Sequence, residues 1–155
     1  MKILRDQRSI ISADDRPRAL GVLRRRYVRE RQHVMRFCQH AARIGDQEIR
    51  RVLLDIAAKE EAHVRLIETQ ILGLGGELPT LVDFHCSTDN LWEYLRSDLD
   101  DERRCLTEIA EDRRAIGAGF PAINALLDRI EMDANEHREQ IRALLSDEER
   151  PLWAA

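Results

Sequence analysis

The stretch IRRVLLDIAAKEEAHVRLIETQI, residues 49–71, has the pattern that decides the fold. Every third or fourth position is apolar except Glu60 and His63, which is the spacing of one face of a long helix. This face consists of Ile49, Leu53, Ile56, Glu60, His63, Ile67 and Ile71. A carboxylate and an imidazole one turn apart form a Glu-x-x-His pair, with which helical bundles build two-metal sites.

The same face recurs in INALLDRIEMDANEHREQI, residues 123–141, where His137 takes the place of His63. Ala134, however, stands where a repeat of Glu60 would supply a second carboxylate. The two halves of the chain therefore predict two helical hairpins around a metal site, and they also predict that this site lacks a ligand.

The composition of the 155-residue chain favours a single all-α domain, because charged residues make up 35% and aromatic residues only 5%. The net charge is -4 and both signs are interspersed, so nucleic acid is not an expected partner. Neither a membrane-spanning apolar run nor a signal-peptide pattern is present, and a cytoplasmic location is expected.

Periodicity and helix-ending residues predict four helices, at residues 17–44, 47–72, 89–116 and 121–145. Gly45 is expected to end the first helix as a left-handed residue. Residues 74–88 form one long connection, which in a bundle runs along its length. The predicted architecture is a four-helix bundle over 17–146 with one long crossover, preceded by an arm at 1–16 and followed by a short tail at 147–155.

Polar residues interrupt the apolar face of every helix: Glu30 on the first, Glu60 and His63 on the second, Glu102 on the third and His137 on the fourth. An unpaired buried carboxylate costs several kcal/mol, so such a set requires a neutralising partner. Oxygen and nitrogen ligands of this kind suit iron, manganese or zinc. The alternative is that each Glu lies at the rim of the core and each His packs by ordinary hydrogen bonding.

The remaining histidines and cysteines give weaker signals. His33 follows Glu30 by one turn but leaves the apolar face, so it is expected at the surface, as is His40. Cys38 and Cys105 fall in helical segments and are interpreted as small core residues. Cys86 follows His85 in the long connection, and two adjacent ligands are a weak metal signal.

The segment Leu95-Arg96-Ser97-Asp98-Leu99-Asp100-Asp101-Glu102 resembles the start of the third helix of bacterioferritins, members of the ferritin-like superfamily. The spacings from His63 to Glu102 and from Glu102 to His137 also fit that family. The resemblance covers roughly residues 17–145 and implies a ferritin-like four-helix bundle.

The resemblance implies a role for each matching residue. Glu60 corresponds to a bridging carboxylate and Glu102 to a terminal one, while His63 and His137 correspond to the imidazoles on the two irons. Tyr27 stands where the first helix should supply a terminal Glu, and Glu30 lies one turn away, where it could partly replace that ligand.

Three other departures from the family bear on function. Ala134 replaces the second bridging Glu, so about one tight ion per chain is expected rather than two. Glu61 occupies the place of the haem-ligating Met, so no haem is expected. The short tail also truncates the family's fifth helix, which lines a symmetry axis of its cage.

The expected function is therefore that of a bacterioferritin-like protein that binds iron, as one or two ions, or another divalent transition metal. Iron storage or ferroxidase-like Fe(II) oxidation is the expected role, in a homodimer or small homo-oligomer. The rival interpretation is a non-catalytic bundle in which Tyr27 fills the space at Ala134. A rubrerythrin-like peroxide reductase is a third, which the lack of a Cys-x-x-Cys pair disfavours.

Overall fold

A computed structural model describes residues 11–82 and 90–146 of the chain. It contains the helices α2 (Arg16–Arg43), α3 (Gln47–Gly73), α4 (Leu91–Ile116) and α5 (Pro121–Ser146). These bounds agree with the sequence prediction to within one or two residues. The predicted tail and most of the predicted arm lie outside the described residues, as do His85 and Cys86.

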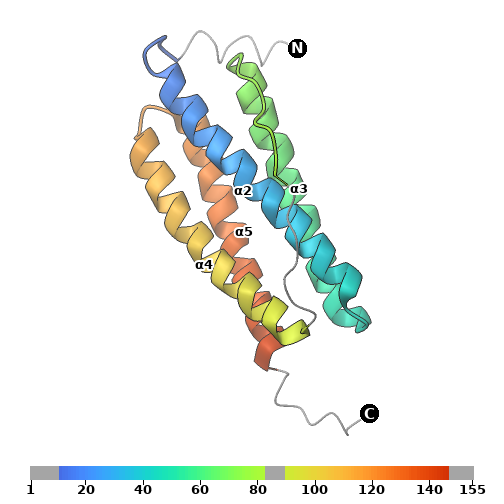
Figure 1. Cartoon of the computed structure of the whole chain (residues 1–155). Helices are drawn as coiled ribbons and strands as arrows, with labels where there is room; N and C mark the ends of the chain where they lie inside the picture. The colour runs from blue at the N-terminus through green and yellow to red at the C-terminus, as the bar shows by residue number, and fades with distance from the viewer. Residues whose placement is uncertain (1–10, 83–89, 147–155) are drawn as a thin grey trace, which may run out of the picture.

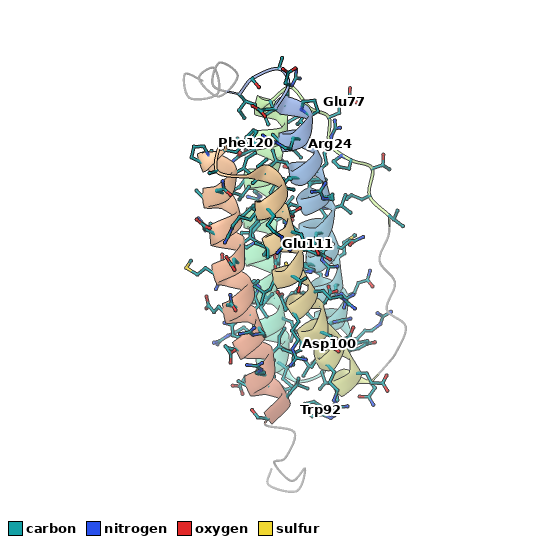
Figure 2. The ribbon with its side chains drawn as sticks, turned by 90° about the vertical axis from the view of Figure 1, so that its left-hand side faces the viewer. Arg24, Glu77, Trp92, Asp100, Glu111 and Phe120 are labelled. Atoms are coloured by element: carbon teal, nitrogen blue, oxygen red, sulfur yellow. The ribbon has the colours of Figure 1, made fainter. Side chains whose placement is uncertain are left out.

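The four helices form a bundle in which α2 packs against α3 and α4, and α5 packs against α3 and α4 (Figure 1). Helix α3 ends and α4 begins at opposite ends of the bundle (Figure 1). The connection between them therefore spans the length of the molecule, and the predicted crossover is confirmed. Arg24 of α2 fixes the start of this connection, because its Nε donates to the Glu77 carbonyl at 3.1 Å (Figure 2).

Short polar side chains start two of the helices. The Asp46 carboxylate accepts from the backbone N–H groups of Glu48 and Ile49, and the Asn90 side chain does the same at the start of α4. Gly117, with φ of 70°, ends α4 in the left-handed region. The expectation that Gly45 ends the first helix in the left-handed region was wrong. Ile44, in an extended conformation, caps α2 after Arg43, and Gly45 has no positive φ.

Two apolar clusters make up the core, one toward each end of the bundle. The first includes Leu23, Ile67, Ile109 and Leu127, and the second includes Phe37, Leu53, Leu95 and Ile141. On every helix, buried polar residues lie between these clusters, and they include Glu30, Glu60, Glu102 and His137. The core is therefore divided by a layer of ionisable side chains.

The contact between α2 and α4 is also ionic. A basic stripe on α2 faces an acidic stripe on α4, with separations of 2.8 Å for Arg26–Asp112, 3.1 Å for Arg29–Glu108, 3.1 Å for His33–Asp101 and 2.8 Å for His40–Asp98. Figure 2 shows α4 in front, between α2 and α5, with Trp92 near its start and Phe120 in the turn that follows its end. None of the four helices has an apolar run that could span a membrane.

Candidate metal centre

Glu60 lies at the centre of the buried polar layer, and three imidazoles turn the same ring atom toward it. The Nδ1 atoms of His33, His63 and His137 lie 3.5, 3.1 and 3.1 Å from the Glu60 carboxylate oxygens. The three histidines come from α2, α3 and α5. Glu60 itself is 2% exposed. One carboxylate on α3 thus gathers three potential nitrogen ligands from three helices.

Two further carboxylates complete the arrangement and divide it into two ligand groups. In the first group, Glu30 Oε2 lies 3.2 Å from His63 Nδ1, and Glu60 is the third member. In the second group, Glu102 joins His33 and Glu60, with ligand atoms all within 4.8 Å of one another. His137 Nδ1 also belongs here, 3.5 Å from Glu102 Oε1. Glu60 is shared by both groups.

Carboxylates behind two of the imidazoles fix the orientation of the rings. Asp133 accepts from His63 Nε2 at 2.8 Å, on the side of the ring opposite Glu60. Asp101 lies 3.1 Å from His33 Nε2 in the same way. A carboxylate on the outer nitrogen directs the inner nitrogen toward the centre, which is the usual arrangement behind metal-bound histidine.

Several buried atoms at the second group have no hydrogen-bond partner among the described residues. They are both carboxylate oxygens of Glu102 and both ring nitrogens of His33 and of His137. Both ring nitrogens of His33, His137 Nδ1 and Glu102 Oε1 have neighbours within ion-pair distance but without the geometry of a hydrogen bond. Unpaired buried polar atoms cost free energy, and a cation between these oxygens and nitrogens would remove that cost. The donor set therefore fits a divalent transition metal.

The carboxylates and imidazoles shift one another's pKa values. Burial opposes ionisation of Glu60, but the neighbouring Glu30 carboxyl and the three imidazoles close to its oxygens outweigh burial and lower its pKa well below the usual value. Burial and the Glu60 charge raise the pKa of Glu30 to about 7. Burial lowers the pKa of an imidazole, yet the neighbouring carboxylates raise the pKa of His63 to about 10 and of His137 to about 9. Without metal, the cluster holds protons.

A guanidinium closes the cluster on the side of Glu30. Arg26 is 2% exposed, and its Nη1 lies 3.4 Å from Glu30 Oε1 and donates to Cys105 Sγ at 3.3 Å. Its Nε and Nη2 donate to Asp112 at 3.2 and 2.8 Å. Burial and the neighbouring carboxylates raise the pKa of the Cys105 thiol well above its ordinary value.

No protein-family model and no curated protein matches the sequence. Among solved structures, the chain is similar to a dodecameric thioferritin, the bacterioferritin-related protein from Bacteroides fragilis. The TM-score is 0.73 at 16% identity, over 96% of this chain and 93% of that one. The fold is ferritin-like. At this identity the similarity establishes the fold alone, and it confirms the predicted class and the resemblance to bacterioferritins at that level.

The ferritin-like bundle brings together five of the six residues that the sequence singled out: Glu30, Glu60, His63, Glu102 and His137. It does not bring Tyr27 into the cluster, because the Tyr27 hydroxyl donates to Glu68 at 3.3 Å. Burial and the Glu68 carboxylate raise the pKa of this phenol. Ala134 is buried, and its methyl side chain offers no ligand atom. Glu61, at the haem-ligand position of the resemblance, pairs with Arg31 at 3.0 Å.

Three further sequence expectations were wrong. His33 and His40 are buried rather than at the surface, because the acidic stripe of α4 receives both rings. Cys38 is exposed rather than in the core. Sequence reasoning also missed Asp133 and Asp101. The 3–4 spacing of Arg26, Arg29, His33, Arg36 and His40 was the signal that could have placed His33 on a contact face.

Proposed function

We propose that this protein binds iron, or another divalent first-row transition metal, in the buried carboxylate–histidine cluster. The observation that carries the proposal is the convergence of three imidazole Nδ1 atoms on Glu60, with Glu30 and Glu102 beside it. An ordinary core would not concentrate so many ionisable groups, because each costs desolvation free energy. A bound cation offsets that cost and supplies the charge that the carboxylates lack.

The two ligand groups support two metal positions that share Glu60. Glu30, Glu60 and His63 would hold one ion, and His33, Glu60, Glu102 and His137 the other. The sequence predicted about one ion because Tyr27 and Ala134 remove ligands. Glu30, one turn after Tyr27 on α2, and His33, one further turn along, would supply ligands in place of the two that are missing. We therefore propose a capacity of two ions that share the Glu60 carboxylate.

With Fe(II) as the substrate, the proposed chemistry is oxidation by dioxygen or peroxide, as in ferroxidases. In this proposal Glu60, Glu30 and Glu102 provide the negative charge that favours Fe(III) over Fe(II). The imidazole protons are released when the metal binds, because only neutral imidazole is a ligand.

Storage of a ferric mineral additionally requires a closed shell of subunits. The similar thioferritin is dodecameric, and twelve copies of this 18.0 kDa chain would have a mass of about 216 kDa. The sequence-based expectation of a dimer or small oligomer predicts a lower mass, about 36 kDa for a dimer of that chain. Light scattering of the purified protein separates a storage shell from a small metal-binding protein.

The direct test is anaerobic Fe(II) titration by calorimetry on the metal-free protein. The wild type should bind up to two ions, and Glu60→Gln should abolish tight binding because it removes the shared ligand. Glu111→Gln is the matched control, since Glu111 is an exposed carboxylate on α4 (Figure 2). Unchanged binding in Glu60→Gln would contradict the proposal.

The rival function is a bundle that retains the fold without chemistry. One observation favours it: His63 has carboxylate partners on both ring nitrogens. Absence of tight Fe(II), Zn(II) or Co(II) binding to correctly folded wild-type protein would establish this alternative.

A further inference from the structure

We infer that Glu30, His33 and Cys105 form an alternative, thiolate-containing position for a borderline divalent metal such as Zn(II) or Co(II). One ligand atom from each residue lies within 4.8 Å of the others, and all three residues are buried. This position goes beyond the proposed carboxylate–histidine centre, with which it shares Glu30 and His33, because its third ligand is sulfur.

The helix geometry points these residues at one another. Glu30 and His33 lie one turn apart on α2, and Cys105 lies on α4, one turn beyond Glu102. His33 is 1% exposed, and neither of its ring nitrogens has a hydrogen-bond partner among the described residues. Asp101 lies near Nε2, so Nδ1 is the nitrogen that faces the inner side, where it also lies 3.5 Å from Glu60. An ion at the sulfur position would therefore take His33 from the ion that it would otherwise bind with Glu60 and Glu102.

Cys105 differs from an ordinary core cysteine in its surroundings. Its Sγ accepts a hydrogen bond from the buried Arg26 guanidinium at 3.3 Å and lies in the group with the Glu30 carboxylate. An apolar pocket would contain neither charge. The Arg26 N–H offsets only part of the cost that burial and the neighbouring carboxylates impose on the thiolate, so the thiolate, which is the form that binds metal, needs a bound cation to form here.

Arg26 does not exclude a second cation, because Asp112 holds it on the far side at 2.8 Å. Glu30, Asp112 and a Cys105 thiolate carry three negative charges. Arg26 and a divalent ion carry three positive charges, and His33 binds as a neutral ligand. Metal uptake breaks the S–H bond, forms a sulfur–metal bond and releases the proton to solvent. The charges of these groups sum to zero, and Arg25, whose side chain is 60% exposed, also pairs with Asp112 at 3.0 Å.

The ligand set also determines which metals should bind. One oxygen, one imidazole nitrogen and one thiolate suit Zn(II), Co(II) and Fe(II), whereas Mg(II) and Ca(II) prefer oxygen ligands only. We expect thiolate ligation to favour Zn(II) and Co(II) here over Mn(II).

The test is anaerobic titration of the intact, metal-free protein with Co(II), monitored by absorption. Thiolate-to-Co(II) charge transfer gives a near-ultraviolet band that oxygen and nitrogen ligands do not produce. The band should appear in the wild type, in Cys38→Ser and in Cys86→Ser, and it should be lost in Cys105→Ser. Cys38 is the matched control within the described residues, because it is an exposed cysteine on α2.

The outcomes separate this inference from the proposed function. Co(II) binding without a charge-transfer band would overturn the sulfur position and leave the carboxylate–histidine centre intact. A band that persists in Cys105→Ser would overturn it as well, and absence of Co(II) binding would overturn both. If Cys105→Ser does not fold, Cys105→Ala retains an apolar side chain in the packed core. His33→Gln should weaken the band without removing a cysteine.

Discussion

At the residue scale, Asp133 illustrates how a side chain outside the ligand set can govern it. It accepts from His63 Nε2 at 2.8 Å and lies near the cationic side chains of Lys59 and Arg129. The ring of His63 is thereby fixed with Nδ1 toward Glu30 and Glu60. Asp133 is a positioning residue in the proposed centre, because it acts only through the imidazole.

Asp133→Asn should therefore weaken metal binding about 10- to 100-fold, the usual effect of losing such a partner. Calorimetric titration with Fe(II) or Zn(II) measures this change. Asp128→Asn is the matched control, because Asp128 is an exposed carboxylate on the same helix, α5. The melting temperature of the metal-free Asp133→Asn protein should change little. An equal loss of metal affinity in Asp133→Asn and Asp128→Asn would argue against a positioning role for Asp133.

The raised pKa values of His63 and His137, about 10 and about 9, predict the pH dependence of stability without metal. A raised imidazole pKa in the folded state contributes stability that is fully present below the unfolded value, about 6.5. That stability is lost as the pH rises through 9 to 10. The metal-free wild type should therefore be more stable than His137→Gln at pH 6.

This difference in stability should narrow as the pH rises toward 10. Urea unfolding in the presence of chelator at several pH values measures it. Glu60 adds the opposite trend at low pH, because its lowered pKa gives stability that is lost on acidification. A difference between the two proteins that stays constant from pH 6 to 10 would contradict the carboxylate contacts assigned to His137.

His33 marks the limit of residue-level prediction. The sequence located Glu60, His63, Glu102 and His137 because each interrupts an apolar face. His33 lies on a different face of α2, among arginines, and a charged face is usually solvated. Only the acidic residues of α4, brought alongside by the fold, make that face an internal contact.

At the element scale, helix length and bounds were the most predictable features. Apolar periodicity set the length of each helix, while Asp46 and Gly117 set two of the helix ends. The pairing of α2 with α4 was not predictable, because either helix alone has the charge pattern of a surface. The specificity of this contact comes from complementary stripes, which a single-helix analysis does not compare.

Arg26→Met tests the strength of that contact. The substitution leaves the buried Asp112 with only Arg25, whose side chain is 60% exposed, at 3.0 Å. Removing one partner of a buried ion pair costs about 3–5 kcal/mol, because the other charge remains desolvated. Urea unfolding should show this loss, whereas Arg43→Met, at an exposed position of the same helix, should cost about 0.5 kcal/mol or less.

The double variant Arg26→Met with Asp112→Leu separates the two contributions. It removes the unpaired carboxylate together with its partner, so a large part of the lost stability should return. A double variant no more stable than Arg26→Met would mean that packing, rather than charge pairing, makes Arg26 important.

At the scale of the whole molecule, the ferritin-like bundle has a core in two parts. One apolar cluster packs the helices together at each end of the bundle, and the ionisable layer lies between the two clusters. The architecture followed from the sequence, since the four periodic faces and the single long connection allow few arrangements. The charge balance within the ionisable layer could not be predicted from the sequence, because the pairing of its carboxylates and imidazoles depends on distances between helices.

Metal binding should raise the stability of the entire bundle, since the ligands come from all four helices and an ion binds only the folded chain. At a metal concentration about 100 times Kd, the gain is about 2.7 kcal/mol. For a domain of this size it corresponds to a rise in Tm of roughly 5–10 °C. Calorimetric melting of Zn(II)-loaded and chelated protein measures the rise.

Glu60→Gln serves as the control in the same melting experiment, because it lacks the shared ligand and should show a much smaller rise with Zn(II). Its metal-free Tm also reports what the cluster contributes on its own. If the wild type and Glu60→Gln gain the same Tm from Zn(II), the ion binds elsewhere on the molecule. If the wild type gains none, the ionisable layer is balanced by its own protons and ion pairs, and the bundle is a structural one.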